Sequence, residues 1–372
     1  MLLTIKGLGP GGAERLLADV VATGNVEDFD YEVAYVLDGE DALAPAIIAG
    51  GTPVHALGST RNLDLRWMAA FRRLLLGGNF DIVHFHLPYT AALGRLVVAT
   101  LPRGKRPVTI YTEHSMWNKV AVLVKMLNRS TIASDRALLA VSDAAYDALP
   151  RSLQPRALIV VHGVNRSLSR EMVDRRSEIR QDVRTELAIT PEDLLVVTVA
   201  NLRSEKGYDV LIDAAHLIAQ RGLPIRFAAA GRGTLQEDLA TKQRAIGLDE
   251  RFRFLGHRDD AFRLLAAADV FVLASHQEGL PVALMEAMSV GAAIVATAVG
   301  GVPQVITDEV NGLIVPPGDP LALADAIERI CSDAALRRRL GSQALVDSSR
   351  FDIARASGEI EEVYRRLVGP DR

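Results

Sequence analysis

The sequence predicts an α/β protein with two consecutive doubly wound domains, each built on a parallel β-sheet. Three observations support this prediction: a length of 372 residues, short apolar runs that alternate with helical segments, and the repetition of that alternation in both halves. A chain of this length exceeds one typical core, so two domains are expected. Strands that are apolar on both faces are typical of parallel sheets covered by helices on both sides.

Thirteen apolar runs are expected to be strands, with helix-spaced segments such as 65–76 between them. In the first half they are 2–5, 31–37, 53–57, 81–86, 107–112, 137–142 and 157–162. In the second half they are 194–201, 225–231, 251–256, 269–275, 292–297 and 312–316.

A polar, charged stretch over 165–191 separates the two sets of strands and is predicted to be a linker that runs into a helix. After Asp319 the pattern is only helical. We therefore expect an N-terminal domain over 1–165, a C-terminal domain over 166–350 and a C-terminal helix over 351–372. A return of that helix to the first domain is one option.

The composition is that of an ordinary globular protein, with 49% hydrophobic and 24% charged residues. The apolar runs are shorter than a bilayer span requires, and the start MLLTIKG lacks the features of a signal peptide. The single Cys331 cannot form an internal disulfide, which suits a reducing compartment. A cytoplasmic location is therefore expected.

The charge is unevenly distributed along the chain. Residues 61–136 hold twelve Lys or Arg and only four Asp or Glu, although the whole chain has a net charge of −4. This segment either attracts an anionic membrane or substrate, or is simply a solvated surface, and the sequence leaves both open. Nucleic acid is not an expected partner, because aromatic residues are scarce and do not interleave the basic ones.

The glycine-rich stretch GLGPGGAE (7–14) follows the first strand and fits the dinucleotide-binding pattern G-x-G-x-x-G. Asp38 closes the second strand, near where a ribose-binding acid would lie. Glu14, however, places a carboxylate in the first helical turn, close to any pyrophosphate. A nicotinamide-dependent oxidoreductase is therefore one alternative function.

The stretch SHQEGLPVALMEAMSVGAAIV (275–295) follows a buried strand, at the sheet edge where ligands bind in open α/β folds. Pro281 is predicted to be the first helical residue and Gly291 to lie just past the helix. The amides around Gly279, Leu280, Pro281 and Val282 would then form an anion site at the helix start.

Glu278 and Glu286 are expected to serve different ends of a bound molecule, or else to be ordinary surface residues. Their eight-residue separation does not suit a glycosidase acid–base pair. Each carboxylate can accept hydrogen bonds from hydroxyls. After the strand at 194–201, Arg203 and Lys206 place two cations near a helix start, which favours a diphosphate.

These motifs resemble the retaining glycosyltransferase family 4, whose members have the GT-B fold. The second half carries EGLPVALME (278–286), AMSVGAAIVAT, VGGVPQVI, NGLIVPPGD (311–319) and NLRSEKGYDVLIDA (201–214). The first half carries GGAE (11–14), VHFH (83–86), YTEHS (111–115), AVSDAA (140–145) and VHGVN (161–165). The resemblance implies two Rossmann-like domains that face a central cleft.

The resemblance also implies transfer of a sugar from a nucleotide-diphosphate sugar with retained configuration. The second domain would bind the donor, with Glu286 on the ribose and Glu278 on the transferred sugar. Arg203 and Lys206 would neutralise the leaving diphosphate, although Arg203 lies two positions after the family's usual arginine. Asn201 occupies the position of that arginine and is expected to bind the donor. Amides of Gly11, Gly12 and residues 279–282 would help to hold sugar and phosphates, and no metal or other cofactor is expected.

His114 matches a family histidine near the donor sugar and is expected to be catalytic. His84 is expected to be structural, and His86 to contact the acceptor. The expected acceptor is a lipid-linked or surface glycan, bound by the first domain at the inner face of the cell membrane in polysaccharide biosynthesis. Alternatives within the same fold are a nucleotide-sugar epimerase, a phosphorylase and a non-catalytic partner of an assembly complex.

Overall fold

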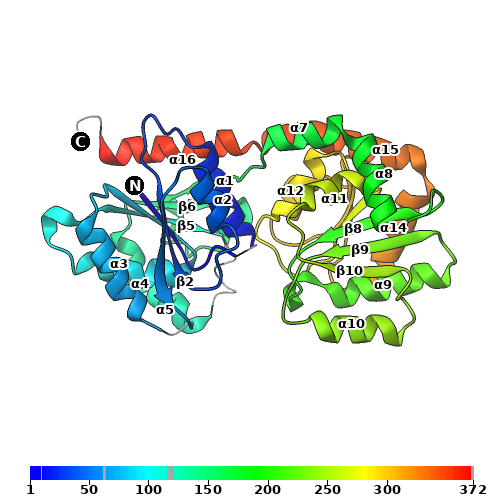
Figure 1. Cartoon of the computed structure of the whole chain (residues 1–372), viewed down its shortest axis with the longest axis horizontal. Helices are drawn as coiled ribbons and strands as arrows, with labels where there is room; N and C mark the ends of the chain where they lie inside the picture. The colour runs from blue at the N-terminus through cyan, green and yellow to red at the C-terminus, as the bar shows by residue number, and fades with distance from the viewer. Residues whose placement is uncertain (10, 62–63, 115–116, 118–120, 370–372) are drawn as a thin grey trace. The chain divides into compact units, whose positions relative to one another are not determined.

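The computed structural model describes residues 1–9, 11–61, 64–114, 117 and 121–369. The chain forms two compact units (Figure 1). Unit 1 contains Met1–Gly163 together with the chain from Ile353 onward, and unit 2 contains Val164–Asp352. Each unit has its own parallel sheet, so the prediction of two doubly wound parallel-sheet domains is confirmed.

The sheet of unit 1 has seven strands in the order β3-β2-β1-β4-β5-β6-β7, and all neighbouring strands are parallel. Side chains of β1 alternate between two cores: Leu2 packs with Trp67 and Phe71, whereas Leu3 and Ile5 pack on the opposite face. The sheet is therefore covered on both sides. Its strands are β1 (Leu2–Ile5), β2 (Glu32–Leu37), β3 (Val54–Ser59), β4 (Ile82–His86), β5 (Val108–Glu113), β6 (Ala137–Ala140) and β7 (Ala157–Ile159). Apart from the C-terminal helix, its helices are α1 (Gly12–Thr23), α2 (Ala44–Ala49), α3 (Arg66–Gly77), α4 (Pro88–Ala99), α5 (Val122–Thr131) and α6 (Asp143–Asp147).

The sheet of unit 2 has six parallel strands in the order β10-β9-β8-β11-β12-β13. The order reverses direction between β8 and β11, the kind of switch point where open α/β sheets bind ligands. The strands are β8 (Leu194–Val199), β9 (Ile225–Ala230), β10 (Phe252–Gly256), β11 (Val270–Leu273), β12 (Ala293–Thr297) and β13 (Leu313–Val315). The helices are α7 (Arg166–Asp174), α8 (Arg176–Glu186), α9 (Tyr208–Gln220), α10 (Gln236–Ala245), α11 (Ala261–Ala267), α12 (Val282–Ser289), α13 (Val302–Val305), α14 (Pro320–Ser332) and α15 (Ala334–Asp347).

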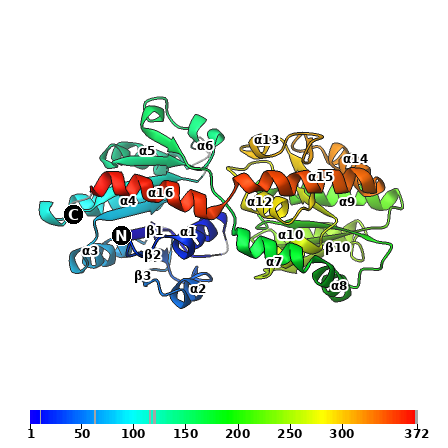
Figure 2. The same ribbon diagram turned by 90° about the horizontal axis from the view of Figure 1, so that it is seen from above.

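The C-terminal helix α16 (Ile353–Val368) belongs to unit 1, where Figure 2 shows it beside α1. Tyr364 is fully buried and its hydroxyl lies 2.6 Å from Nδ1 of His84 in β4. Tyr31 donates a hydrogen bond of 2.8 Å to Glu361. The end of the chain is thus part of the core of unit 1.

The segment expected to be a linker leading into a helix is mostly helical, because it forms α7 and α8 in succession. The buried apolar residues of α8 are only Ile179 and Val183, four positions apart, which explains why this stretch looks polar in the sequence. Within the described residues, no helix has the length and hydrophobicity needed to cross a membrane.

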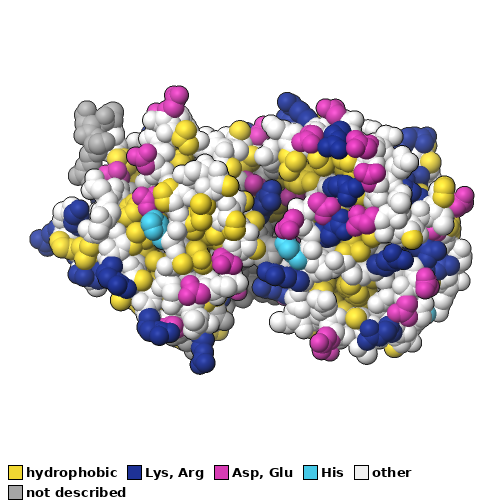
Figure 3. All heavy atoms as spheres, in the orientation of Figure 1, with side chains coloured by type: hydrophobic (Ala, Val, Ile, Leu, Met, Phe, Trp, Pro, Cys, Tyr) yellow, Lys and Arg dark blue, Asp and Glu magenta, His cyan; other side chains and the backbone are white. Residues whose placement is uncertain are grey.

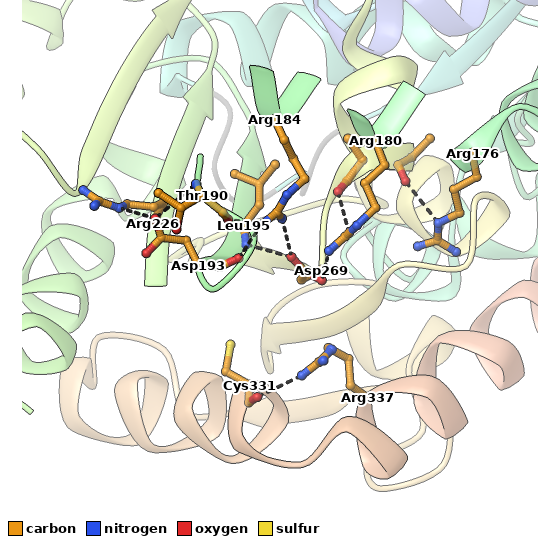
Figure 4. Close-up of polar contacts among 12 residues, drawn as sticks. Arg176, Arg180, Arg184, Thr190, Asp193, Leu195, Arg226, Asp269, Cys331 and Arg337 are labelled. Carbon is orange, nitrogen blue, oxygen red and sulfur yellow. Dashed lines mark hydrogen bonds and ion pairs between the residues drawn. The ribbon is translucent and has the colours of Figure 1, made fainter. Parts of the chain in front are cut away.

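Ion pairs join α8 to the amino-terminal end of the second sheet (Figure 4). Asp269 lies just before β11 and accepts hydrogen bonds from Arg180 Nη2 at 2.6 Å and from the amide of Leu195 at 2.8 Å. Arg176 Nε donates to the carbonyl of Ala266 at the end of α11. These contacts lie at the opposite end of the strands from the candidate site and therefore fix the scaffold.

Candidate functional site

The carboxyl ends of β8 and β11 bring together a lysine and a glutamate that are 72 residues apart. Nζ of Lys206 lies 2.7 Å from Oε1 and 2.8 Å from Oε2 of Glu278. Ser275 donates a further hydrogen bond of 2.6 Å to Oε1. Only 7% of Glu278 is exposed, so the carboxylate is held in one position by an ammonium group and a hydroxyl.

Two glycines allow the loops around this pair to pack closely. Gly207, after Lys206, has a φ of +62°, and a Cβ there would lie 2.0 Å from the carbonyl oxygen of Ala274. Gly300 has a φ of +53°, and a Cβ there would lie 2.0 Å from the carbonyl oxygen of Glu278. Any side chain at either position would push apart the backbone segments that carry the pair.

Helix α12 begins one residue later than predicted, because Pro281 has an extended conformation (ψ 118°) and caps the helix. Gly291 lies just past its end with a φ of +70°, as the sequence predicts. The first amides of a helix have no intrahelical acceptor, so those at Val282 and its neighbour are available to an anion. The loop before the helix is fixed by a hydrogen bond of 2.7 Å from the amide of Gly301 to the carbonyl of Gly279.

The remaining predicted residues of unit 2 lie along the same edge. Glu286 is the fifth residue of α12 and is partly exposed. Asn201 and the exposed Arg203 lie between β8 and the short 3-10 helix Ser204–Lys206. Leu280 is buried beneath the loop. The structure therefore brings cationic groups, helix amides and carboxylates to one edge of the sheet.

In unit 1, the glycine-rich turn leads into α1, with Gly11 as the N-cap and Gly12 as the first helical residue. The carboxylate of Glu14 lies directly over the N-cap, since a Cβ on Gly11 would meet its Oε2 at 2.1 Å. A negative group therefore occupies the place where a dinucleotide's pyrophosphate would bind. Pro10 of this turn lies outside the described residues.

Four histidine rings lie side by side in unit 1, within β4 or just after strands β5 and β7, and are called the histidine stack below. His114 follows β5, and its Nε2 lies 2.9 Å from Nδ1 of His86. The ring of His162 is parallel to that of His114 within 8°, at a centroid distance of 5.2 Å. On the other side, the rings of His84 and His86 are 4.4 Å apart.

Three of these imidazoles are buried and His114 is partly exposed, but desolvation within the protein keeps all four neutral. It lowers the pKa of His84 and of His114 to about 3, and it lowers the pKa of His86 and of His162 well below the usual value of 6.5. Sequence reasoning missed the stack and expected His86 to contact an acceptor, whereas the ring is buried and contacts His114. The available signal was the position of His86, His114 and His162 at or just after the end of a strand.

Family models match both halves of the chain. Residues 179–346 match the model described as "Glycosyl transferases group 1", and residues 10–167 match "Glycosyltransferase Family 4". Together they cover both units.

Similar proteins are glycosyltransferases by name. The D-inositol 3-phosphate glycosyltransferase of Xylanimonas cellulosilytica is 30% identical over 78% of this chain and 73% of its own length. The phosphatidyl-myo-inositol mannosyltransferase of Mycobacterium leprae is 30% identical over 80% of this chain and 76% of its own length. The alpha-D-kanosaminyltransferase of Streptomyces kanamyceticus is 28% identical over 66% of this chain, and the match spans 64% of that protein, slightly under two thirds.

A solved structure supports the same fold. The Anabaena protein HepE in complex with UDP aligns over 98% of this chain and 99% of its own with a TM-score of 0.81, at 20% identity. The two parallel sheets, the family models and these relatives all indicate the same family and fold. The chain therefore belongs to the group 1 glycosyltransferases of family 4 and has their GT-B fold.

Proposed function

We propose that this protein is a retaining, metal-independent glycosyltransferase that moves a hexosyl group from a nucleotide-diphosphate sugar to a glycan or lipid-linked acceptor. In the reaction, the bond between the anomeric carbon and the diphosphate breaks. A bond from that carbon to an acceptor hydroxyl oxygen forms, and the hydroxyl proton leaves with the diphosphate or to solvent. The observation that carries the proposal is the ion pair between the partly exposed Lys206 and the buried Glu278 beside the start of α12.

Each group at this edge has a task in such a reaction. Lys206 and Arg203, with the first amides of α12, would stabilise the negative charge that grows on the leaving diphosphate. Glu278 would accept hydrogen bonds from the transferred sugar, and Glu286, farther along the helix, would accept them from the ribose. In unit 1, His114 would contact the transferred sugar, and the amides of Gly11 and Gly12 would face its hydroxyl groups rather than the phosphates, because the carboxylate of Glu14 lies over Gly11.

The donor class is supported by the solved relatives. HepE has been crystallised in complex with UDP and with UDP-glucose, and this chain shares its fold. The position of Glu14 over the start of α1 disfavours the oxidoreductase alternative, since that function needs a pyrophosphate there. An epimerase remains the alternative within the fold, and product analysis separates the two because an epimerase converts the donor without an acceptor.

A membrane-bound or lipid-linked acceptor is supported by the surface of unit 1. Helix α5 exposes Val122, Leu123 and Met126 by 67%, 76% and 65%. Lys125 and Arg129 lie on the same helix, within the basic segment 61–136. Apolar side chains beside basic ones suit the surface of an anionic membrane at the cytoplasmic face. Figure 3 shows charged side chains of both signs on the visible faces of both units, with hydrophobic side chains gathered over the face of unit 1.

The proposal is tested by incubating the protein with UDP-, GDP- and ADP-sugars in the presence of EDTA and measuring the release of nucleoside diphosphate. We expect release from one donor class, and a product whose anomeric configuration equals that of the donor. Inversion of the configuration would reject the retaining mechanism, and activity only after a divalent metal is restored would reject metal independence.

Membrane binding is tested separately. Vesicles rich in phosphatidylglycerol should retain the protein, and the Met126→Asp variant should bind them less. A lack of binding combined with efficient transfer to a small soluble acceptor would reject the membrane role.

A further inference from the structure

The stack of four histidines in unit 1 contains a hydrogen bond whose direction can be deduced. His86 is 4% exposed and has two ring nitrogens with different surroundings. Its Nδ1 lies 2.9 Å from Nε2 of His114, while its Nε2 is buried without a partner in the part of the chain that the structure describes. Because the ring is neutral, only one of these nitrogens carries a proton.

The proton of His86 belongs on Nδ1. A buried N–H group without an acceptor is rarer and more unfavourable than a buried lone pair without a donor. Placing the proton on Nδ1 leaves Nε2 as a bare lone pair and makes His86 the donor to His114. Nε2 of His114 must then be the acceptor, so the single proton of that neutral ring lies on Nδ1.

His162 restrains the same ring from its face. The two rings are stacked within 8° of parallel at a centroid distance of 5.2 Å. Neither nitrogen of His162 has a partner among the described residues, so its one N–H is unpaired in either tautomer, whereas His86 has one partnered nitrogen on which to carry its proton. His162 therefore contributes its ring surface rather than a hydrogen bond. It is 3% exposed and packs beside Val160 and Ile360 in the wall of a small pocket, which His114 also lines.

We propose that His86 and His162 are positioning residues that hold His114 as the Nδ1–H tautomer, a neutral hydrogen-bond donor for a hydroxyl oxygen of the transferred sugar. This inference rests on the proposed function, because that function gives His114 its contact with the sugar. A neutral donor suits an uncharged hydroxyl better than it suits a phosphate. His114 thus acts neither as a base through Nε2 nor as a cation.

The tautomer is measured directly with two-bond ¹H–¹⁵N correlation spectra of the whole protein labelled at its histidines, near pH 7.5 and without substrate. In the wild type we expect a protonated Nδ1 and a bare Nε2 at His114. The His86→Asn variant can still donate from the position of Nδ1 and should keep this pattern. The His86→Leu variant cannot, and His114 should then shift toward the Nε2–H form.

Turnover gives the second readout. His86→Leu should lower kcat about tenfold with little change in KM, which corresponds to the loss of one hydrogen bond in the transition state, and His86→Asn should recover most of it. His162→Phe keeps a flat ring without titratable nitrogens and should retain activity, whereas His162→Ala should lose it. Activity of His162→Phe as low as that of His162→Ala would remove His162 from the proposal.

An Nε2–H tautomer at His114 in the wild type would overturn the inference, whether or not the His86 variants fold. An unchanged Nδ1–H form in a folded His86→Leu variant would also overturn it. The spectra need no turnover, so they separate this inference from the proposed function. A protein with the expected tautomer but no sugar transfer would reject the function and keep the arrangement of the histidines.

Discussion

The buried histidines make the stability of unit 1 depend on pH, and His84 allows the effect to be calculated. It is fully buried between Tyr364 of α16 and Thr112 of β5, and burial lowers its pKa from 6.5 to about 3. Below pH 6.5 the unfolded chain binds a proton that the folded unit excludes. The contribution of His84 to the free energy of unfolding is therefore fully present above pH 6.5, the pKa in the unfolded chain. It decreases as the pH falls toward about 3, the pKa in the folded protein.

Between pH 8 and pH 5, this difference in pKa lowers the free energy of unfolding of unit 1 by about 2 kcal/mol for His84 alone. The other three histidines have lowered pKa values as well, so the total loss should exceed this figure. As the pH falls from 6.5 to 5, the slope of the unfolding free energy against pH should correspond to the uptake of several protons on unfolding.

Tryptophan fluorescence during urea denaturation measures this loss in unit 1 selectively. Both tryptophans of the chain, Trp67 and Trp117, are buried in unit 1. The matched control is His84→Gln, whose amide can still bond to Tyr364 and Thr112 but does not titrate. Between pH 8 and pH 5, the free energy of unfolding of this variant should fall by about 2 kcal/mol less than that of the wild type. Equal unfolding free energies of the wild type at the two pH values would refute the reasoning.

Four further predictions follow from the site and the scaffold. Glu286→Gln should weaken donor binding about tenfold, since it removes a charge-assisted hydrogen bond to the ribose, and calorimetry with the donor would show it. Lys206→Ala should lower kcat about 100-fold with a smaller change in KM, in steady-state assays of nucleotide release. Asp269→Ala should destabilise unit 2 by about 2 to 3 kcal/mol in calorimetric unfolding, because it leaves the partly buried Arg180 and the amide of Leu195 without their acceptor. Cys331 is buried and its pKa is raised to about 12, so it should react with a thiol reagent only upon unfolding.

Most of the strands were predictable because they are short, largely apolar runs that stand out between the helix-spaced segments. The location of the site residues of unit 2 was predictable as well, because ligand-binding loops follow the carboxyl ends of the strands and the strand ends could be read from the sequence. Two details were wrong for local reasons. Pro281 is the cap rather than the first residue of α12, and the supposed linker consists largely of helices whose apolar stripe is only one residue wide per turn.

The histidine stack could not be predicted from the sequence, because its members come from three strands. Only the strand order β4-β5-β6-β7 brings His86, His114 and His162 to one edge. The contact between Tyr364 and His84 depends in addition on the placement of α16 in unit 1. Similarly, the Lys206–Glu278 pair required β8 and β11 to be neighbours, which the sequence order does not specify.

Donor binding tests the central claim most directly. Isothermal titration of the protein with UDP-, GDP- and ADP-sugars and with NADH, repeated for Glu286→Gln, compares the two ligand classes in one experiment. The account predicts that one class of nucleotide-diphosphate sugar binds, that Glu286→Gln weakens this binding, and that NADH does not bind. Binding of NADH without binding of any nucleotide-diphosphate sugar would contradict it.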